Sequence, residues 1–514
     1  MSIIRVMGRD FMDNRFNIVR RRDPITLAAT GAALTAFFAT VVVPGITVGS
    51  LAITLALSGA SYLLQSALAP QAPKAAADQG QKLTVQQAVP SQRLIYGRAL
   101  VGGPLFFYEC KPPFLYLGIV LASHEIAGVD EFRIGDKAVS LDANGNATST
   151  NFNNGTQSYV QLSIRTGTAS QAIDPILAAD FTELPSTFRQ RGHATAVLKL
   201  RYGNDATDHE KYWGTGSPKP YFLVKGMKVY DPRKASHSTS DPTTWEWSDN
   251  SSLCLAHYLT FSKGCNRPWT AIDTASLAKS ASDDDQQIQL LSGAFESRYS
   301  INGVVDTTAE PASVVLDMLT SNLGRLIWRD GSYTFISGVP RDAVWTLNDD
   351  SARGSMDARY TRPSRELVNT VRTTFTSPER EYQTANGPVL INAAYLAADG
   401  EAHEISITLP FTATHTRAQR IAKATMERAR LGKLITRRES IEAIRLSAAD
   451  IINIESTFLA SLGMRAELNA IKLSADTLEV EIEAEQHLNS IYDWSAATDE
   501  QAFTIAPASL AGVN

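Results

Sequence analysis

A long stretch without any charged residue, from position 24 to position 73, most constrains what this chain can fold into. It contains two apolar segments, 25–43 and 46–68, which are separated by Pro44 and Gly45. Each segment is close to the ~20 residues that a helix needs to cross a hydrocarbon core. A Pro-Gly pair favours a turn and would break a continuous helix. The sequence therefore predicts a helical hairpin over residues 24–69, with its turn at Pro44-Gly45.

Two environments would suit this hairpin, and the sequence does not choose between them. Small residues recur on both arms, so the two helices could pack closely. Arg20, Arg21 and Arg22 before the hairpin and Lys74 after it would keep both ends on one side of a membrane, the cytoplasmic side or its equivalent. The hairpin could be a double membrane span, or it could be buried in a protein assembly and released to a membrane later. Both environments require satisfied backbone groups and no charge.

The composition of the whole chain is that of a globular protein. At 514 residues it is too long for one compact core, so about two to four domains are expected. Hydrophobic residues make up 44 % of the chain, and the net charge of −5 argues against a general basic surface for nucleic acid. Three cysteines are too few for a disulfide scaffold. Cys254 and Cys265 are too far apart for a CxxC zinc pair, so buried free thiols are favoured over a metal site there.

After a linker at 70–85, hydrophobic periodicity predicts an α+β protein dominated by antiparallel sheet. Residues that alternate between polar and apolar predict strands, and strand–turn–strand patterns predict hairpins, one of them around Asp330-Gly331. The predicted strands lie within 158–167, 194–203, 366–377 and 401–411. A hairpin is predicted at 325–338, and strand–turn–strand units are predicted at 296–306 and 464–485.

Three helices are predicted, at 251–261, 311–324 and 416–434. Ser251 or Ser252 is the expected N-cap of the first. The third has an apolar face through Ala418, Ile421 and Met426, and its basic residues are expected on a solvated face rather than against nucleic acid. The acidic run at 283–285 is expected at a solvated helix start or in a linker.

No sequence motif indicates catalysis or a cofactor. The chain lacks GxSxG, HExxH, Walker A and GxGxxG patterns, and "HEIAG" at 124–128 lacks the second histidine of a zincin. Carboxylates are plentiful enough for a glycosidase pair, but no spacing points to one. Four tryptophans could line a sugar-binding surface, although packing in a core or interface is favoured. They are Trp213, Trp245, Trp247 and Trp269.

Several short motifs, in order, resemble tail-tip hub proteins of long-tailed bacteriophages, the lambda J-like family. "VPSQRLIYGRALVGGPLFFYE" at 89–109 resembles the opening of the first hub domain, with a Tyr-Gly-Arg turn and then a Gly-Gly turn. The matching residues are Tyr96, Gly97, Arg98, Gly102 and Gly103.

A second stretch, "GMKVYDPRKASHSTSDPTTWEWSDNSSLCLAHYLT" at 226–260, resembles the same family more closely. Its matching residues are Val229, Tyr230, Asp231, Pro232, Arg233, Trp247, Ser248, Asn250, Tyr258 and Thr260. The expected Asn-Pro is Asn250-Ser251 here. Farther on, 311–338 with Asp330 and Gly331 resembles the helix and hairpin of the next hub domain, and 366–383 with Asn369 and Val371 resembles the strand that follows.

The resemblance implies a non-enzymatic virion protein without cofactors. It implies a homotrimeric hub that closes the distal end of the tail tube, contacts the distal tail protein, the tape-measure protein and tail fibres or other tip proteins, and takes part in host attachment and DNA ejection. Genome DNA would pass through the lumen without specific binding. Because the chain ends soon after the hub, separate fibres are expected to bind the receptor.

The resemblance does not cover the apolar hairpin. In a trimeric tip the hairpin is expected to act as a plug that enters the host envelope during ejection, or as a structural core. The competing interpretation is a double-spanning membrane protein with a β-rich soluble domain, in an envelope or secretion complex.

The expected organisation follows from these patterns. It is an N-terminal segment (1–23), the hairpin (24–69), a linker (70–85), a first hub domain (86–265) with an inserted β subdomain near 126–190, a linker or helical segment (266–300), a second set of hub domains (301–490) of barrel or sandwich type, and a C-terminal tail (491–514).

Overall fold

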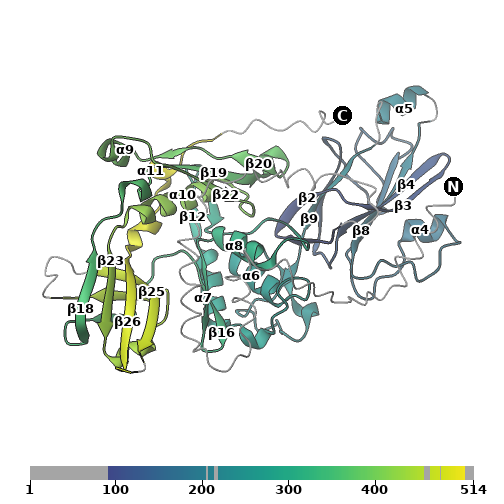
Figure 1. Ribbon diagram of the computed structural model, residues 1–514. Coiled ribbons are helices and arrows are strands. Elements are labelled where there is room, and N and C mark those ends of the chain that lie inside the picture. Colours follow the sequence, from purple (N-terminus) through teal and green to yellow (C-terminus); the bar gives the residue numbers. More distant parts are fainter. Residues whose placement is uncertain (1–90, 204–205, 214–217, 457–463, 475, 504–514) are drawn as a thin grey trace, which may run out of the picture.

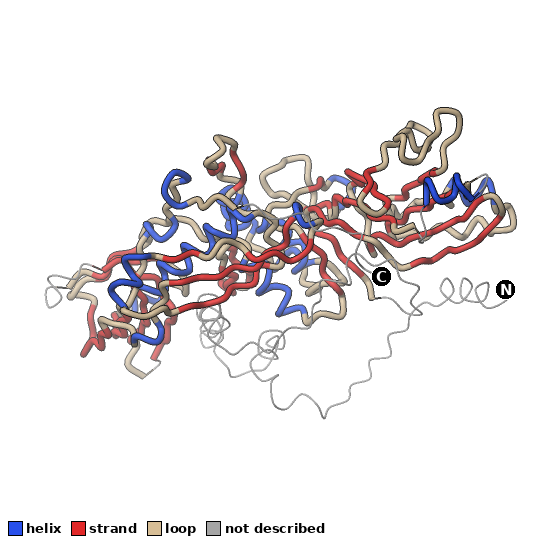
Figure 2. The backbone as a smooth tube through the Cα atoms, turned by 90° about the horizontal axis from the view of Figure 1, so that it is seen from above, coloured by secondary structure: helices blue, strands red, loops and turns tan. Residues whose placement is uncertain are grey.

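A computed structural model of the chain describes residues 91–503, except 204–205, 214–217, 457–463 and 475. The described residues form an elongated row of β-rich bodies with helices in the middle (Figure 1). The molecule is also elongated when it is seen from above (Figure 2). The predicted hairpin at 24–69, with Pro44 and Gly45, lies outside the described residues.

Two four-stranded antiparallel sheets at one end of the row pack around one apolar core, here called the first sandwich. Its strands are β2 (Arg98–Val101), β3 (Leu105–Lys111), β4 (Phe114–Ala122), β5 (Gly128–Ile134), β6 (Lys137–Ala138), β7 (Val160–Arg165), β8 (Ala194–Arg201) and β9 (Pro220–Lys225). Their orders are β2-β9-β5-β6 and β3-β4-β8-β7. Ile119, Leu198 and Phe222 are fully buried between the sheets. The helices α4 (Pro175–Asp180) and α5 (Ala206–Trp213) lie in its connections.

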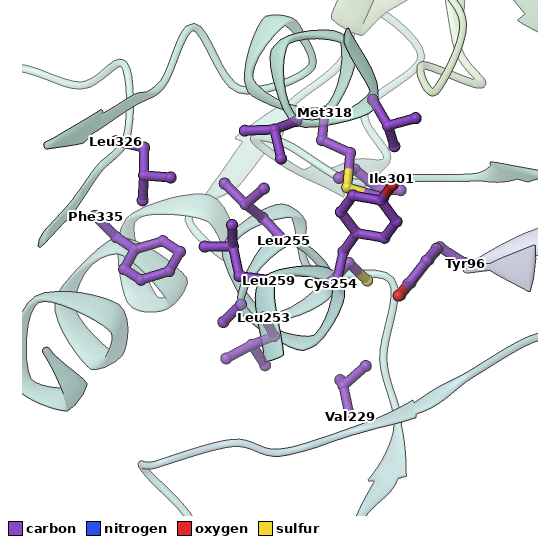
Figure 3. Close-up of a cluster of buried hydrophobic side chains, with 14 of the residues drawn as sticks. Tyr96, Val229, Leu253, Cys254, Leu255, Leu259, Ile301, Met318, Leu326 and Phe335 are labelled. Atoms are coloured by element: carbon purple, nitrogen blue, oxygen red, sulfur yellow. The ribbon is translucent and has the colours of Figure 1, made fainter. Parts of the chain in front are cut away.

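A helical central body follows, built around a helix that is buried along nearly its whole length. It contains β1 (Arg93–Tyr96), β10 (Lys228–Val229), β11 (Glu246–Trp247), α6 (Ser251–Thr260), α7 (Thr274–Asp284), β12 (Gln287–Gln289), β13 (Phe295–Ser297), β14 (Gly303–Asp306), α8 (Pro311–Thr320), β15 (Arg325–Arg329) and β16 (Ser332–Ile336). Every residue of α6 from Ser251 to Leu259 is buried. Leu255, Met318 and Phe335 bring α6, α8 and β16 into one apolar cluster (Figure 3). Large apolar side chains that exclude water from all sides of α6 hold this body together.

Both strands of the strand–turn–strand predicted at 296–306 are present, but they do not pair with each other. β13 pairs with β12, whereas β14 pairs with β1 from the start of the described chain. The backbone between the two strands bonds to other segments, since Ile301 N donates to Asp249 O and Asn302 N to Phe411 O. These buried donors are therefore satisfied by non-local partners and not by a local turn.

The far end of the row consists of two further sheets. The first contains β19 (Thr370–Ser377), β20 (Gln383–Asn386), β21 (Leu390–Ile391) and β22 (Glu404–Leu409), with α9 (Ala393–Asp399) and α10 (His415–Arg430). The second contains β17 (Trp345–Leu347), β18 (Ala352–Arg359), β23 (Leu434–Glu439), β24 (Ile451–Ile454), β25 (Met464–Ser474) and β26 (Glu479–Gln486), in the order β17-β24-β25-β26-β23-β18. α11 (Ala496–Asp499) follows.

The α+β, mainly antiparallel fold class is confirmed. Among the strand pairs of the described residues, only β17–β24 and β19–β22 are parallel. The hairpins at 325–338 and 464–485 form as predicted, as β15–β16 and β25–β26. The helix predicted at 416–434 is α10, and its apolar face is confirmed because Ala418, Ile421 and Met426 are buried.

The predicted solvated basic face of α10 is wrong. Arg417 and Arg420 are only 8 % and 6 % exposed. Both contact Glu296 of β13, with Arg420 Nη1 2.8 Å from Glu296 Oε1. Because β13 covers this side of α10, the arginines point into the protein and pair with the partly buried carboxylate of Glu296.

Candidate functional site

The Tyr-Gly-Arg turn marks the place where the chain leaves the central body for the first sandwich. Tyr96 ends β1, which pairs with β14, and Arg98 begins β2, which pairs with β9. Gly97 between them has a φ of +61°, and a Cβ atom there would lie 2.0 Å from Ile301 O. Only glycine permits this backbone conformation together with so close an approach. Gly97 is therefore the residue at which the chain passes from the β1–β14 pair to the β2–β9 pair.

Arg98 fixes the same turn from the sandwich side. Its Nε lies 3.0 Å from Asp130 Oδ2, and its guanidinium carbon lies 4.5 Å from the centre of the Trp247 ring. The Trp247 indole N–H donates to Gly97 O at 3.2 Å. Residues that resemble one family motif at 96–98 and another at 226–260 are thus in direct contact, through a cation–π pair and a hydrogen bond.

Tyr96 anchors the turn in the core of the central body. Its side chain is fully buried and reaches the cluster around α6 (Figure 3). Its hydroxyl lies 3.0 Å from His257 Nδ1. Burial lowers the pKa of His257 to about 3, so this imidazole is neutral at physiological pH. The pair is a buried neutral hydrogen bond between β1 and α6.

The Val-Tyr-Asp-Pro-Arg turn, which contains Pro232, is tied to the start of α6 by a chain of polar contacts. Asp231 accepts hydrogen bonds from the backbone and the guanidinium of Arg233. Arg233 Nη1 lies 2.9 Å from Asp285 Oδ2, and Asn250 Nδ2 donates to Asp285 Oδ1 at 2.9 Å. Burial alone would raise the pKa of Asp231, but Arg233 lowers it below its usual value. Tyr230 packs edge-on against the ring of Trp269, with the ring centres 5.1 Å apart.

Asn250 is the N-cap of α6, and the predicted Ser251 or Ser252 is not. Asn250 Oδ1 accepts a hydrogen bond from Leu253 N at 3.2 Å. Its amide also donates to Ala281 O of α7. Asparagine can cap and bridge at the same time because it has both an acceptor and two donors. We call Tyr96, Gly97, Arg98, Tyr230, Asp231, Arg233, Trp247 and Asn250 the motif cluster, since they converge around α6.

The remaining predicted positions lie elsewhere and have local roles. Gly102 and Gly103 lie between β2 and β3, where the chain crosses from one sheet of the sandwich to the other, and a Cβ on Gly103 would lie 1.9 Å from Val120 O. Asp330 and Gly331 form the exposed β15–β16 turn with φ of 50° and 80°. Asn369 is fully buried at the start of β19, where it donates to Asp399 Oδ2 and Glu401 O.

No metal centre is evident in the described part of the chain, where no three His, Cys, Asp or Glu side chains are grouped to hold an ion. The Cys254 thiol is buried and donates to Ser248 O at 3.4 Å.

Residues 310–468 match the protein family described as "putative phage tail protein". The whole fold is similar to that of a chain in the virion of a native gene transfer agent particle, at 15 % identity and a TM-score of 0.57 over 91 % of this chain and 98 % of that one. This likeness shows a shared fold. No curated protein matches the sequence. The family match supports the assignment of this chain as a phage tail protein.

Two further tail proteins are similar at lower scores. One from Neisseria meningitidis MC58 is 11 % identical, over 79 % of this chain and 98 % of that one, with a TM-score of 0.30. The 43 kDa tail protein of prophage MuSo2 from Shewanella oneidensis is 8 % identical, over 78 % of this chain and 95 % of that one, with a TM-score of 0.28. Scores this low do not bear on the fold.

Most of a buried ionic cluster that the sequence did not predict lies within the matched residues. Glu467 of β25 is 3 % exposed and contacts three arginines. Its carboxylate lies 3.1 Å from Arg325, 2.8 Å from Arg341 and 2.5 Å from Arg428. Burial alone would raise the pKa of Glu467, but the arginines lower it to about 2. His487 lies 3.7 Å away, and burial lowers its pKa to about 4.

These five residues, which we call the Glu467 cluster, come from separate parts of the fold. Arg325 belongs to β15 of the central body, Arg428 to α10, and Glu467 to the six-stranded sheet. Burying a carboxylate is costly unless cations compensate it, so the carboxylate requires all three parts to stay in place. In the sequence, the only indication of this cluster is Glu467 itself, a charged residue at an inward position of the strand predicted from residue 464.

A second unpredicted group joins α6, α7 and β16. Asp284 is fully buried, which corrects the expected solvated acidic run. Its carboxylate accepts from Ser252 Oγ and Ser337 Oγ, at 2.6 Å each, and from Ser252 N at 2.8 Å. Among the described residues it has no cationic partner. Burial raises its pKa to about 7, although the serine hydrogen bonds act in the opposite direction.

Replacing Gly97 with Ala should destabilise the protein far more than the same change at Gly135. Both glycines have nearly the same φ, +61° and +62°, but Gly135 has nothing within 4 Å of its added Cβ. We expect Gly135→Ala to cost about 1 kcal/mol of unfolding free energy and Gly97→Ala roughly 3 kcal/mol or more. Chemical denaturation of both variants measures this, and equal losses would show that the close approach to Ile301 is unimportant.

Asp284→Asn should change how stability depends on pH. The folded pKa of Asp284 lies above its unfolded value, so its favourable contribution is complete below about pH 4 and is lost as the pH rises through about 7. Asparagine is neutral at every pH and avoids this loss. The melting temperature of the variant relative to the native protein should therefore rise between pH 5 and pH 8. A difference that stays constant over this range would contradict the assignment.

Proposed function

We propose that the chain is the central hub at the distal tip of a phage tail, acting there as a structural homotrimer. The observation that carries this proposal is the motif cluster. Two separate stretches that resemble hub proteins meet in space, and the contact between Arg98 and Trp247 joins the first sandwich to the central body. Arg233–Asp285 then ties the second stretch to the end of α7 within the central body. The family match at 310–468 supports the wider assignment to a tail.

The mechanical demands of a hub are consistent with these contacts. A tail tip must hold its shape until the host is reached, so its bodies must not move freely against one another. Interfaces between domains within a chain allow movement unless they are large and hydrophobic. Here contacts cross the borders at two places, the partly exposed Arg98–Trp247 contact and the buried Glu467 cluster. The described body would therefore behave as a stiff wall element of the tip.

The proposed partners are the distal tail protein, the tape-measure protein, and fibres or other tip proteins. Genome DNA would pass through the lumen of the trimer without specific binding. The net charge of −5 suits such a passage, because a basic lining would hold the phosphate backbone. We also propose the domain organisation given above, with the hub domains at 86–265 and 301–490. The central body contains residues of both proposed domains and of the segment between them.

The apolar hairpin at 24–69 would plug the tip and enter the host envelope during ejection. No helix among the described residues is long and apolar enough to cross a membrane. The proposal for the hairpin therefore rests on its charge-free length and its Pro44-Gly45 turn.

Immunogold labelling separates the hub from the rival membrane protein. An antibody against residues 86–514 should label the distal end of tailed particles in a lysate from cells that produce the protein. Image averaging of labelled tips should show three copies. Gold on membrane fragments, with unlabelled tails or none, would favour a double-spanning membrane protein and overturn the hub.

Deleting residues 24–73 should block tip assembly or DNA ejection. Without the hairpin, the tip would lack its plug and the apolar element that reaches the envelope. Plaque counts measure infectivity, and electron microscopy of the same lysate separates missing tails from intact tails that keep their DNA. Deletion particles with native infectivity would refute a role for the hairpin.

A further inference from the structure

A polar hollow of about 460 Å³ lies on the first sandwich. One wall consists of strand residues, with Phe114 on β4, Lys199 and Arg201 on β8, and Gln161 on β7. The other wall is the asparagine-rich segment between β6 and β7. The volume falls within the ~300–1,000 Å³ of typical small-molecule sites. In Figure 1, β4 and β8 lie at the end of the molecule away from β18 and β26.

The hollow presents one uncompensated charge of each sign. Lys199 is neutralised, since its Nζ lies 2.6 Å from Asp180 Oδ2. Arg201 has no carboxylate partner in the described part of the chain, and its guanidinium lies over Phe114, 5.5 Å from the ring centre. Asp142 likewise has no cationic partner there, and hydrogen bonds from Asn146 lower its pKa. A guanidinium donor and a carboxylate acceptor therefore both face the ligand space.

The segment that forms the second wall is held in place by its own side chains. Asp142 Oδ1 accepts from Asn144 N and Asn146 N, at 2.9 and 2.8 Å. Asn153 Nδ2 donates to Ala147 O, and Asn154 Oδ1 accepts from Gln157 N at 2.8 Å. A wall that is ordered before binding costs a ligand less conformational entropy.

The chemistry of this lining excludes most ligand classes. A phosphate or a nucleic acid would be repelled by Asp142, and a cationic ligand by Arg201. An apolar ligand would leave the charged groups and the side-chain amides, such as that of Gln161, without hydrogen bonds, which is unfavourable. A neutral ligand with many groups that can both donate and accept hydrogen bonds would satisfy the charged groups and the side-chain amides together.

We propose that this hollow binds a neutral saccharide, one unit of a longer polysaccharide. Sugar hydroxyls donate to Asp142 and accept from Arg201, and the side-chain amides do both. Phe114 lies beneath Lys199 and Arg201 and holds these two donors in place by cation–π contacts. The inference does not depend on the proposed position of the chain in the tail. It also places saccharide binding away from Trp245, Trp247 and Trp269, which pack in the central body.

The test is binding of the purified full chain to a printed array of oligosaccharides. The neutral probes contain glucose, galactose, N-acetylglucosamine and rhamnose, and the acidic probes contain glucuronic acid. The protein is kept in a detergent without a sugar headgroup, which would otherwise compete. Calorimetry then measures the affinity for the strongest neutral probe, with inorganic phosphate as a competitor.

We expect at least one neutral probe to bind, and phosphate not to displace it. Arg201→Gln and Asp142→Asn should each weaken binding about tenfold, the factor expected when one hydrogen bond to a charged group is lost. Asp142→Asn keeps an acceptor for the loop, so the wall should remain folded. Arg359→Gln, at an exposed strand arginine of β18, is the matched control and should bind like the native chain.

Three results would overturn the proposal. On the array, these are no capture of any neutral probe and stronger capture of the glucuronic acid probes. In calorimetry, the third is either displacement by phosphate or an equal loss of affinity in Arg359→Gln, since each shows that binding does not use the hollow as proposed. Circular dichroism of each variant establishes that it is folded. The hub proposal stands or falls separately, by the labelling of tails.

Discussion

The buried carboxylate of Glu467 constrains how three parts of this molecule pack against one another. A single negative charge lies among three arginines, and burial makes each of these charges costly unless all are present. The arginines come from β15, from α10 and from the segment before β17, so compensation exists only when three bodies of the fold are docked. Apolar packing makes each body compact, and this cluster specifies how the bodies meet.

Local patterns predicted local structure well. The turn at Asp330-Gly331, the apolar face of α10 and the β25–β26 hairpin each depend on residues close in sequence, where periodicity and turn chemistry act directly. The pairing of β1 with β14 depends on contacts between distant segments, which no local window contains. Arg420 and Asp284 were misplaced for the same reason. A charged residue resembles a solvent-facing one until its buried partner is known.

The resemblance to hub proteins selects the residues of the candidate site, and only the fold shows how they are arranged. The resemblance to hub proteins named Gly97, Arg98, Trp247 and Asn250 in two separate stretches, and the structure brings them together around α6. Asp330 and Asn369 came from the same resemblance and remain apart. Motif matching identifies positions where the backbone conformation or a polar contact requires a particular residue. Only the fold shows which of these residues contact one another.

The antiparallel pairing of β1 with β14 has a consequence for how the chain folds. The first sandwich is enclosed in sequence between β1 and β14, so it is an insertion into the central body and not a preceding unit. The strands of the sandwich, β2 to β9, lie between β1 and β14 in the sequence. They can therefore pair with one another before β1 pairs with β14. Closing so long a loop is slow for an unfolded chain, but a folded insertion brings its two ends near each other. A sandwich that folds first would therefore lower the entropic cost of bringing β1 and β14 together.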